Sequence, residues 1–383
     1  MRLVLHGGFG EKGRTSIAVE CDGYRLLLDA GVKTSARGHD DYYPAISQAT
    51  LKAADAIVIT HGHEDHVAAL GWYIARGFNG RLFMTAETRR EADFCLASYA
   101  TEEHRELVRQ ANVEHLPVGD GTFVLGPLTI FTGRSGHIAG GVWCRVNDGR
   151  TTFHYCGDVV PESPVFAMDP ILPCTAIALD ASYGDDDVCS RDRVVQIREW
   201  ITSRPMGCVL PTPLYGRSAE LLGIIPGGVA LAPGMRDALR TQIAASNWLR
   251  ADTVDALAAR VDSAGEWRDG MTLPRAALLC HDGMGISGPS RSILESALVA
   301  DHPTLFTGHL PTHSPGERMV AEGRATWIRL PTHPTLTENL AMVATSAAST
   351  ILGHSCDRPQ LTRLAEYVPS LRTDLATGDY VDL

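Results

Sequence analysis

The chain has 383 residues, of which 44% are hydrophobic and 21% are charged. This length predicts one large domain or two, and the composition is ordinary for a soluble globular enzyme. The formal net charge of −11 argues against a strong non-specific nucleic-acid binder, because phosphate affinity depends on clustered Lys and Arg, although it allows a nuclease with a locally positive cleft.

Nine cysteines are scattered along the chain, and none forms a C-x-x-C pair. This pattern excludes a disulfide framework and a zinc ribbon built on cysteines. The apolar runs are far shorter than a membrane span, and the opening residues, MRLVLHGGFG, do not form a secretory signal. We therefore expect a cytoplasmic protein that does not contact a membrane.

Short strands dominate the first part of the chain. Residues 16–20 and 24–29 alternate as strands and flank the turn CDG, which is a hairpin signal. Residues 53–60 predict a buried strand, and helical periodicity follows at 66–77 and 85–100. Further strands are predicted at residues 128–133, 140–146, 151–158 and 176–182. Such runs of strands with interspersed helices predict a sandwich of sheets covered by helices.

The pattern changes near residue 186. Helices at 193–204, 218–225 and 290–299 alternate with strands at 208–213 and 276–281, which is typical of a small parallel α/β unit. A strand–helix–strand–helix pattern returns in the last fifty residues. We therefore predict one domain formed by residues 1–185 and 331–383, and a second domain, residues 186–330, inserted into it.

A group of ionisable residues follows the predicted strand 53–60. In the segment THGHEDH, His61 and His63 are two residues apart, so an extended backbone directs both imidazoles to one side. Asp65 and His66 follow where the chain enters a helix. The pattern H-x-H-x-D-H therefore offers two imidazoles to one metal ion and a carboxylate with an imidazole to a neighbouring one. Imidazole with carboxylate suits zinc, and manganese or iron are alternatives.

Four ligands cannot fill two metal sites, so further ligands are needed elsewhere. Three candidates stand at predicted strand ends: His137 in SGHIAGG, Asp158 in YCGDV and His354 in ILGHS. Asp158 is placed to bridge two cations. Each residue alone would be a weak signal, but together they complete a coherent dinuclear arrangement.

These motifs resemble those of the metallo-β-lactamase superfamily. LLLDAG, THGHEDH, SGHIAG and YCGDV follow one another along the chain in the order of that superfamily's motifs. Three later segments narrow the resemblance to its β-CASP nucleases, which include ribonuclease J and the cleavage subunit of messenger-RNA 3′-end processing: CVLPTPLYGRSAELL, CHDGMGISGPSRSILE and FTGHLPTHSPGERMV. The resemblance implies an α/β fold, namely an αββα metallo-β-lactamase sandwich with an inserted parallel α/β β-CASP domain.

The resemblance also implies a ligand set for two Zn²⁺ ions, with Mn²⁺ or Fe²⁺ as alternatives. One ion would be held by His61, His63 and His137. The second would be held by His66, His354 and Asp65, which is also a catalytic carboxylate, and Asp158 would be shared. Asp29 in LLLDAG would hold the other nitrogen of a ligand histidine.

A general acid for the leaving group must come from outside the metal ligands. The family pattern points to His333 in LPTHPT, with Asp180 in ALDASYG as the residue that orients it. The residues around His333 depart from the usual motif, so His309 and His313 remain alternatives. Arg217, Ser287 and Ser290 are candidate phosphate contacts, although Ser290 is explained equally well as a helix cap.

The expected function is hydrolysis of phosphodiester bonds in RNA or single-stranded nucleic acid, with a water bridging the two metals as the nucleophile. Two alternatives stay open. One is a metal-dependent hydrolase of a small ester, thioester or cyclic nucleotide, and the other is a non-catalytic subunit of a processing complex. A homodimer or a processing-complex partner is compatible with either the leading function or its alternatives.

Overall fold

Residues 1–119 and 121–383, apart from the side chains of His39 and Asp40, are described by a computed structural model. By its internal contacts the chain divides into two units. Unit 1 consists of Met1–Pro161, Met168–Asp187 and His333–Leu383, and unit 2 of Glu162–Ala167 and Val188–Thr332. The sequence placed boundaries near residues 186 and 330 but did not indicate that Glu162–Ala167 packs with the second unit.

The first sheet of unit 1 has seven strands within the described residues, in the order β19-β1-β2-β3-β4-β5-β6. The predicted hairpin joins β2 to β3 through Asp22 and Gly23, whose positive φ angles of 47° and 80° suit a tight turn that follows the twist of the strands. β3 to β6 run parallel to one another. The bounds are β1 (Arg2–Gly7), β2 (Ser16–Cys21), β3 (Tyr24–Leu28), β4 (Ala56–Val58), β5 (Arg81–Met84), β6 (Val113–His115) and β19 (Tyr380–Asp382).

The second sheet of unit 1 has six described strands in the order β18-β11-β10-β9-β8-β7. β7 to β10 form an antiparallel meander, whereas β10, β11 and β18 are parallel. The register of the last pair aligns Asp180 with His354. The bounds are β7 (Thr122–Leu125), β8 (Leu128–Arg134), β9 (Val142–Asn147), β10 (Thr152–Tyr155), β11 (Ala176–Asp180) and β18 (Thr350–His354).

Alternation along the strands explains why helices cover both sheets. In β3 and β4, Leu27 and Ile57 pack against one helical layer, while their neighbours Leu26 and Val58 are buried on the opposite face. That layer contains α1 (His39–Tyr42), α2 (Gln48–Lys52), α3 (Glu64–Val67), α4 (Leu70–Ala75), α5 (Ala86–Tyr99) and α6 (Glu102–Gln110).

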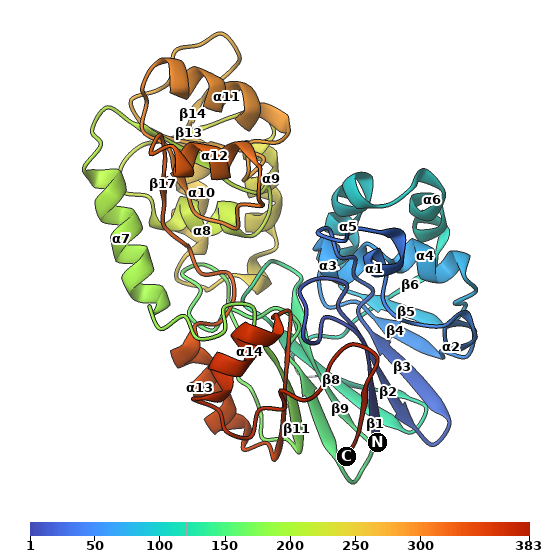
Figure 1. The fold of residues 1–383 in the computed structure, drawn as a ribbon. Coiled ribbons are helices and arrows are strands. Elements are labelled where there is room, and N and C mark those ends of the chain that lie inside the picture. The colour runs from blue at the N-terminus through green and yellow to red at the C-terminus, as the bar shows by residue number, and fades with distance from the viewer. Residues whose placement is uncertain (120) are drawn as a thin grey trace. The chain divides into compact units, whose positions relative to one another are not determined.

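The second sheet has a core of its own, in which Ile177 and Ile351 pack with Leu336 and Leu361. The last two residues belong to α13 (Leu336–Ser346) and α14 (Arg358–Ala365). Figure 1 shows the strands of unit 1 between α4–α6 on one side and α13 and α14 on the other. This is the predicted αββα sandwich.

Unit 2 is built on a parallel sheet of four described strands in the order β12-β15-β13-β14. The predicted fold class, a sandwich with an inserted parallel α/β unit, is therefore confirmed. Its elements are α7 (Ser190–Thr202), β12 (Cys208–Pro211), α8 (Arg217–Ile224), β13 (Val229–Leu231), α9 (Met235–Ala244), η1 (Ser246–Trp248), α10 (Val254–Ser263), β14 (Gly265–Glu266), β15 (Ala277–Cys280), α11 (Gly288–Val299), β16 (Leu305–Phe306), α12 (Pro315–Ala321) and β17 (Thr326–Trp327). Among the described helices of either unit, none is both long enough and apolar enough to cross a membrane.

Candidate metal centre

The HGHEDH segment connects β4 to the short helix α3. The single helix predicted over residues 66–77 is wrong in this respect, since α3 ends at Val67 and α4 begins at Leu70. One hydrogen bond explains the break between α3 and α4. The N–H of Ala69 donates to the carbonyl of Ala30 instead of to a carbonyl of its own helix. Gly31 permits this close approach, since a Cβ there would overlap the carbonyl oxygen of Asp65.

The first group of donor atoms comes from His61, His63, His137 and Asp158, whose ligand atoms all lie within 4.8 Å of one another. Nε2 of His61 and Nε2 of His137 lie 3.6 and 3.7 Å from Oδ2 of Asp158. Nε2 of His137 is 3.0 Å from Nδ1 of His63. Three imidazoles from two separate loops therefore converge on one carboxylate oxygen.

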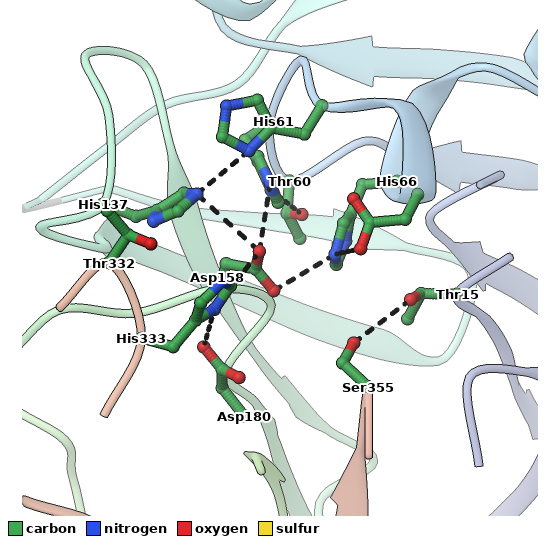
Figure 2. A network of polar contacts seen from close by, with 12 residues as sticks. Thr15, Thr60, His61, His66, His137, Asp158, Asp180, Thr332, His333 and Ser355 are labelled. Carbon is green, nitrogen blue, oxygen red and sulfur yellow. Dashed lines mark hydrogen bonds and ion pairs between the residues drawn. The ribbon is translucent and has the colours of Figure 1, made fainter. Parts of the chain in front are cut away.

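The second group consists of Asp65, His66 and the same Asp158. Nε2 of His66 is 3.1 Å from Oδ1 of Asp158 and 3.8 Å from Oδ2 of Asp65. The two oxygens of Asp158 thus face different groups, as a bridging carboxylate requires. Figure 2 shows Asp158 in the middle of this network, with His66 on one side and His137 on the other.

Asp158 also belongs to a third group, with Asp180 and His333. Nδ1 of His333 is 2.9 Å from Oδ2 of Asp180 and 3.6 Å from Oδ2 of Asp158. Burial lowers the pKa of His333, but the two carboxylates outweigh it and raise that pKa to about 10. The backbone amides of Val159 and Ser182 donate to Asp180, which fixes its carboxylate at the end of β11.

The donor atoms fit a divalent cation. Nε2 of His61 is buried without a hydrogen-bond partner among the described residues. Nε2 of His66 and Oδ1 of Asp158 are buried 3.1 Å apart, but neither makes a contact with hydrogen-bond geometry among the described residues. Unpaired buried polar atoms are costly, and their convergence is explained when they share a metal ion. Burial lowers the pKa of His61 well below its usual range, which keeps the imidazole in the neutral form that binds metals.

The charge balance around His66 also favours a cation. Burial lowers its pKa, but Asp158, Asp65 and Asp29 outweigh that effect and hold the pKa of His66 well above its usual range. An excess of carboxylates in a buried place stabilises positive charge there. A divalent ion would supply that charge in place of the imidazolium.

Asp29 lies at the centre of the hydrogen bonds that support two of the histidines. Oδ2 of Asp29 is 2.7 Å from Nδ1 of His66 and accepts a 2.7 Å hydrogen bond from the hydroxyl of Tyr155. The hydroxyl and amide of Thr60 also donate to Asp29, and the same hydroxyl is 3.1 Å from Nδ1 of His61. One carboxylate thereby fixes the ring of His66 directly and that of His61 through Thr60.

His354 stands at the margin of the second group. Its ring centroid is 6.4 Å from that of His66, so it lies outside the three sets of ligand atoms that fall within 4.8 Å of one another. Nδ1 of His354 is 3.0 Å from Oγ of Ser355, and its buried Nε2 has no hydrogen-bond partner among the described residues. The ring is therefore held from one side with an unsatisfied nitrogen on the other.

Helix α5 supports both ligand loops, a role that the sequence did not indicate. The hydroxyls of Thr85 and Thr88, both buried, lie 2.9 and 3.1 Å from the carbonyl oxygen of Gly140, three residues beyond His137. A Cβ at Gly62, between His61 and His63, would lie 2.8 Å from Cβ of Glu91 on the same helix. The sequence offered one signal for this contact with α5. Both ligand loops contain glycines, Gly62 and Gly140, at which a helix can approach the backbone closely.

The family assignment follows from the sequence of the first half of the chain. The profile of the metallo-beta-lactamase superfamily matches residues 10–206. The chain belongs to the metallo-β-lactamase superfamily. In this superfamily the cluster of histidines and aspartates is a divalent-metal site.

Three curated relatives are similar to parts of this chain. Transcription termination factor FttA from Methanothermobacter thermautotrophicus is 27% identical over 248 residues, which are 58% of this chain and 39% of that protein. Ribonuclease TTHA0252 from Thermus thermophilus is 27% identical over 240 residues, 59% of this chain and 54% of that protein. Cleavage and polyadenylation specificity factor 73 from Drosophila melanogaster is 26% identical over 239 residues, 57% of this chain and 34% of that protein.

The chain therefore spans about half, or less, of the length of these relatives. A crystal structure of a protein of unknown function from Enterococcus faecalis V583 matches over 100% of this chain and 99% of that one, with a TM-score of 0.62 and 14% identity. At this identity the match shows only that the two proteins share a fold, and the shared fold covers the whole of this chain, unit 2 included.

The three candidate phosphate contacts all lie in unit 2. Arg217, the first residue of α8, donates from a terminal guanidinium nitrogen to Oγ1 of Thr332, and its Nε is buried without a hydrogen-bond partner among the described residues. Ser287 donates its hydroxyl to Asp282. Ser290 is fully buried, and its hydroxyl donates to the carbonyl of Ser287. Of the three, Arg217 keeps donor capacity for a ligand.

Proposed function

We propose that the protein is a metal-dependent nuclease that hydrolyses phosphodiester bonds in RNA or single-stranded nucleic acid. The observation that carries this proposal is the position of Asp158, whose two oxygens face two different groups of metal-binding side chains. The superfamily match and the names of the relatives, which include a ribonuclease and a cleavage factor, support it. The small-molecule and non-catalytic alternatives have no comparable support.

We assign the ligands as two sets that share Asp158. His61, His63 and His137 would hold one ion, and Asp65, His66 and His354 the other. The mixture of imidazoles and carboxylates supports zinc, with Mn²⁺ or Fe²⁺ as alternatives. His354 is assigned to the second set because its buried Nε2 lacks a hydrogen-bond partner among the described residues and its ring centroid is 6.4 Å from that of His66.

Two divalent cations held by these residues would supply an activated water molecule and stabilise charge on a phosphoryl oxygen. The side chains of the protein then have two further tasks. Asp65 and Asp158 place negative charge around the ions, and Asp29 fixes the rings of His66 and, through Thr60, His61. Those contacts keep the donor atoms oriented.

The leaving oxygen needs a proton, and we assign its donation to His333. This imidazole lies outside both ligand sets, and Asp180 accepts at its Nδ1, which leaves Nε2 to face a substrate. The neighbouring carboxylates favour the protonated ring that a general acid requires. In unit 2, Arg217 would contact backbone phosphates through its planar fork of N–H donors.

The test uses end-labelled RNA and single-stranded DNA with metal-loaded and chelated protein. We expect cleavage by the metal-loaded wild type, and a loss of cleavage on chelation and in Asp158→Asn. A matched control is Asp169→Asn, which removes an aspartate of unit 1 that pairs with Arg134 outside the cluster. A wild type that cleaves neither polymer, or an Asp158→Asn variant as fast as wild type, contradicts the proposal. Elemental analysis of the purified protein identifies the metal.

A cytoplasmic location and a homodimer or processing-complex partner stay predictions. Fractionation of cells and the mass of the protein in solution test them.

A further inference from the structure

The glycine-rich loop between β1 and β2 lies against two parts of the candidate metal centre. The carbonyl of Gly8 accepts the amide of Ser355 at 2.7 Å, one residue after His354. At the other end of the loop, the amide of Thr15 donates to the carbonyl of Asp65 at 2.9 Å. The hydroxyls of Thr15 and Ser355 are 3.4 Å apart (Figure 2). All of these residues belong to unit 1, so the loop is fixed beside the second group of donor atoms.

The one carboxylate of this loop, that of Glu11, is engaged by three donors. Its Oε1 accepts from Nε of Arg14 at 2.8 Å and from the hydroxyl of Thr377 at 2.7 Å. Its Oε2 accepts from Nζ of Lys33 at 2.7 Å. Glu11 therefore does not neutralise the residue that follows it, Lys12.

Lys12 extends from the loop toward the pair formed by Asp180 and His333. Its Nζ lies 3.4 Å from the carbonyl oxygen of Ser182. The amide of Ser182 donates to Oδ1 of Asp180 at 3.1 Å. The ring of the next residue, Tyr183, packs edge-on to His333, with the centroids 5.0 Å apart. The ammonium group of Lys12 is therefore held at the segment that positions the proposed proton donor.

This ammonium group is available to a ligand. The side chain of Lys12 is exposed, and among the described residues it forms no ion pair. The carbonyl of Ser182 also accepts from Nε2 of Gln360 at 3.2 Å, so it stays hydrogen-bonded when Lys12 turns to a ligand. An ammonium has three N–H donors and a compact charge, which suits a phosphate oxygen.

A second exposed cation lies over the same loop. The side chain of Arg358, the first residue of α14, packs at Gly10, where a Cβ would be 3.4 Å from Cγ of the arginine. The whole chain carries a net charge of −11, so two exposed cations at one loop beside the metal centre depart from the overall balance. Positive charge at this edge would attract the phosphates of a nucleic acid.

We propose that Lys12 is a substrate-binding residue of unit 1 that contacts a backbone phosphate next to the phosphate that is hydrolysed. This inference rests on the nuclease activity proposed above and gives that activity a contact to the polymer. The ligand class is a chain of phosphodiesters. The contact carries no base preference, because every nucleotide presents the same phosphate.

Fluorescence anisotropy of a labelled single-stranded RNA tests this contact at KCl concentrations from about 50 to about 200 mM. The metal-loaded His333→Ala protein is the background, since slow cleavage leaves the RNA intact during the measurement. Adding Lys12→Met should raise Kd about fivefold at the lowest salt. The slope of log Kd against log salt should become shallower by about 0.7, the value of one phosphate contact on a single strand.

Three further variants, made in the same background, are the controls. Lys12→Arg keeps the positive charge and should retain the slope. Lys12→Gln keeps an N–H donor for the carbonyl of Ser182 without the charge, and it should match Lys12→Met. Lys52→Met removes an exposed lysine at the end of α2 and should bind as the background does.

An unchanged Kd in Lys12→Met overturns the inference. A weaker affinity with an unchanged salt slope also overturns it, as does a Lys12→Gln variant that binds as the background does, because Lys12 would then act by holding the loop to Ser182. The two proposals can fail separately. If the wild type cleaves no RNA, the nuclease proposal fails, and the same binding measurement on the wild type still reports whether Lys12 contacts a phosphate.

Discussion

His333 and Asp180 form a hydrogen-bonded pair, with Nδ1 of the imidazole 2.9 Å from Oδ2 of the carboxylate. The two residues come from different segments of unit 1, and both approach Asp158. The contact fixes the imidazole tautomer and orientation. It holds His333 within the group that contains Asp158.

We predict that His333→Ala lowers the cleavage rate by about 10²–10⁴-fold, the usual effect of losing a general acid. The bound metal should stay at the wild-type amount, because the assigned ligands are intact. Single-turnover rates and elemental analysis on the same preparation measure the two effects. His309→Ala and His313→Asn are the controls, since both residues are exposed and lie in unit 2. If either control loses as much activity as His333→Ala, the assignment of the proton donor is wrong.

The hydrogen bonds of Asp29 lead to a second prediction. Asp29→Asn should weaken metal binding about 10–100-fold, since a carboxylate that is hydrogen-bonded to a ligand histidine orients the imidazole and raises its basicity. Competition with a chromogenic chelator measures the affinity. Tyr155→Phe removes only the hydroxyl that donates to Asp29 and should cost about 1 kcal/mol of stability with a smaller change in affinity. Equal affinities for Asp29→Asn and wild type would show that the ring of His66 needs no such support.

The contact of α5 with the His137 loop gives a third prediction. Thr88→Val keeps the shape of the side chain but removes a hydrogen bond to the carbonyl of Gly140, so the free energy of unfolding should fall by about 1 kcal/mol. Metal affinity should fall with it, because the His137 loop is less well held. Thr88→Ser retains the hydroxyl and is the matched control. If the serine variant loses as much metal affinity as the valine variant, the hydroxyl is not what holds the loop.

A buried carboxyl in unit 2 leads to a prediction about pH. Burial raises the pKa of Glu220 from 4.5 to about 7, while Ser163 donates to its Oε1 at 2.6 Å. The folded protein therefore keeps a proton that the unfolded chain loses. Stability should fall as the pH rises from about 4.5 to 7, by on the order of 3 kcal/mol, and should then be constant.

Denaturant unfolding between pH 4.5 and 8 tests this slope. Glu220→Gln cannot ionise, so its stability should lack this decrease. Ser163→Ala removes a hydrogen bond that favours the carboxylate, and the decrease should extend to higher pH. A wild-type stability that rises over this range, or a Glu220→Gln variant with the wild-type slope, contradicts the prediction.

The sequence was informative where the signal is local. The spacing of His61, His63, Asp65 and His66 lies within one segment, and the hairpin of β2 and β3 follows from a short turn. The helix over residues 66–77 was predicted as one because periodicity does not reveal the hydrogen bond from Ala69 to Ala30, which comes from a distant segment. Hydrophobic periodicity carries no information about such tertiary contacts.

Other features depended on side-chain geometry. Asp158 could be suggested as a bridge, but the orientation of its two oxygens follows only from the packing of three loops. Thr85 and Thr88 were indistinguishable from ordinary residues of a helix start. The hydrogen bonds that Asp282 accepts from the amides of its loop could not be predicted for a similar reason. An aspartate before glycines indicates a turn, but it does not indicate how many amides the carboxylate accepts.

The pairing of β11 with β18 has a consequence for how the protein is made. These strands are neighbours, and their register aligns Asp180 with His354, yet the whole of Val188–Thr332 is synthesised between them. A ribosome that has translated the HGHEDH segment and Asp158 has not yet produced His333 or the edge strand of the second sheet. The residues assigned to the proposed site are therefore complete only after the whole of the inserted unit has been synthesised.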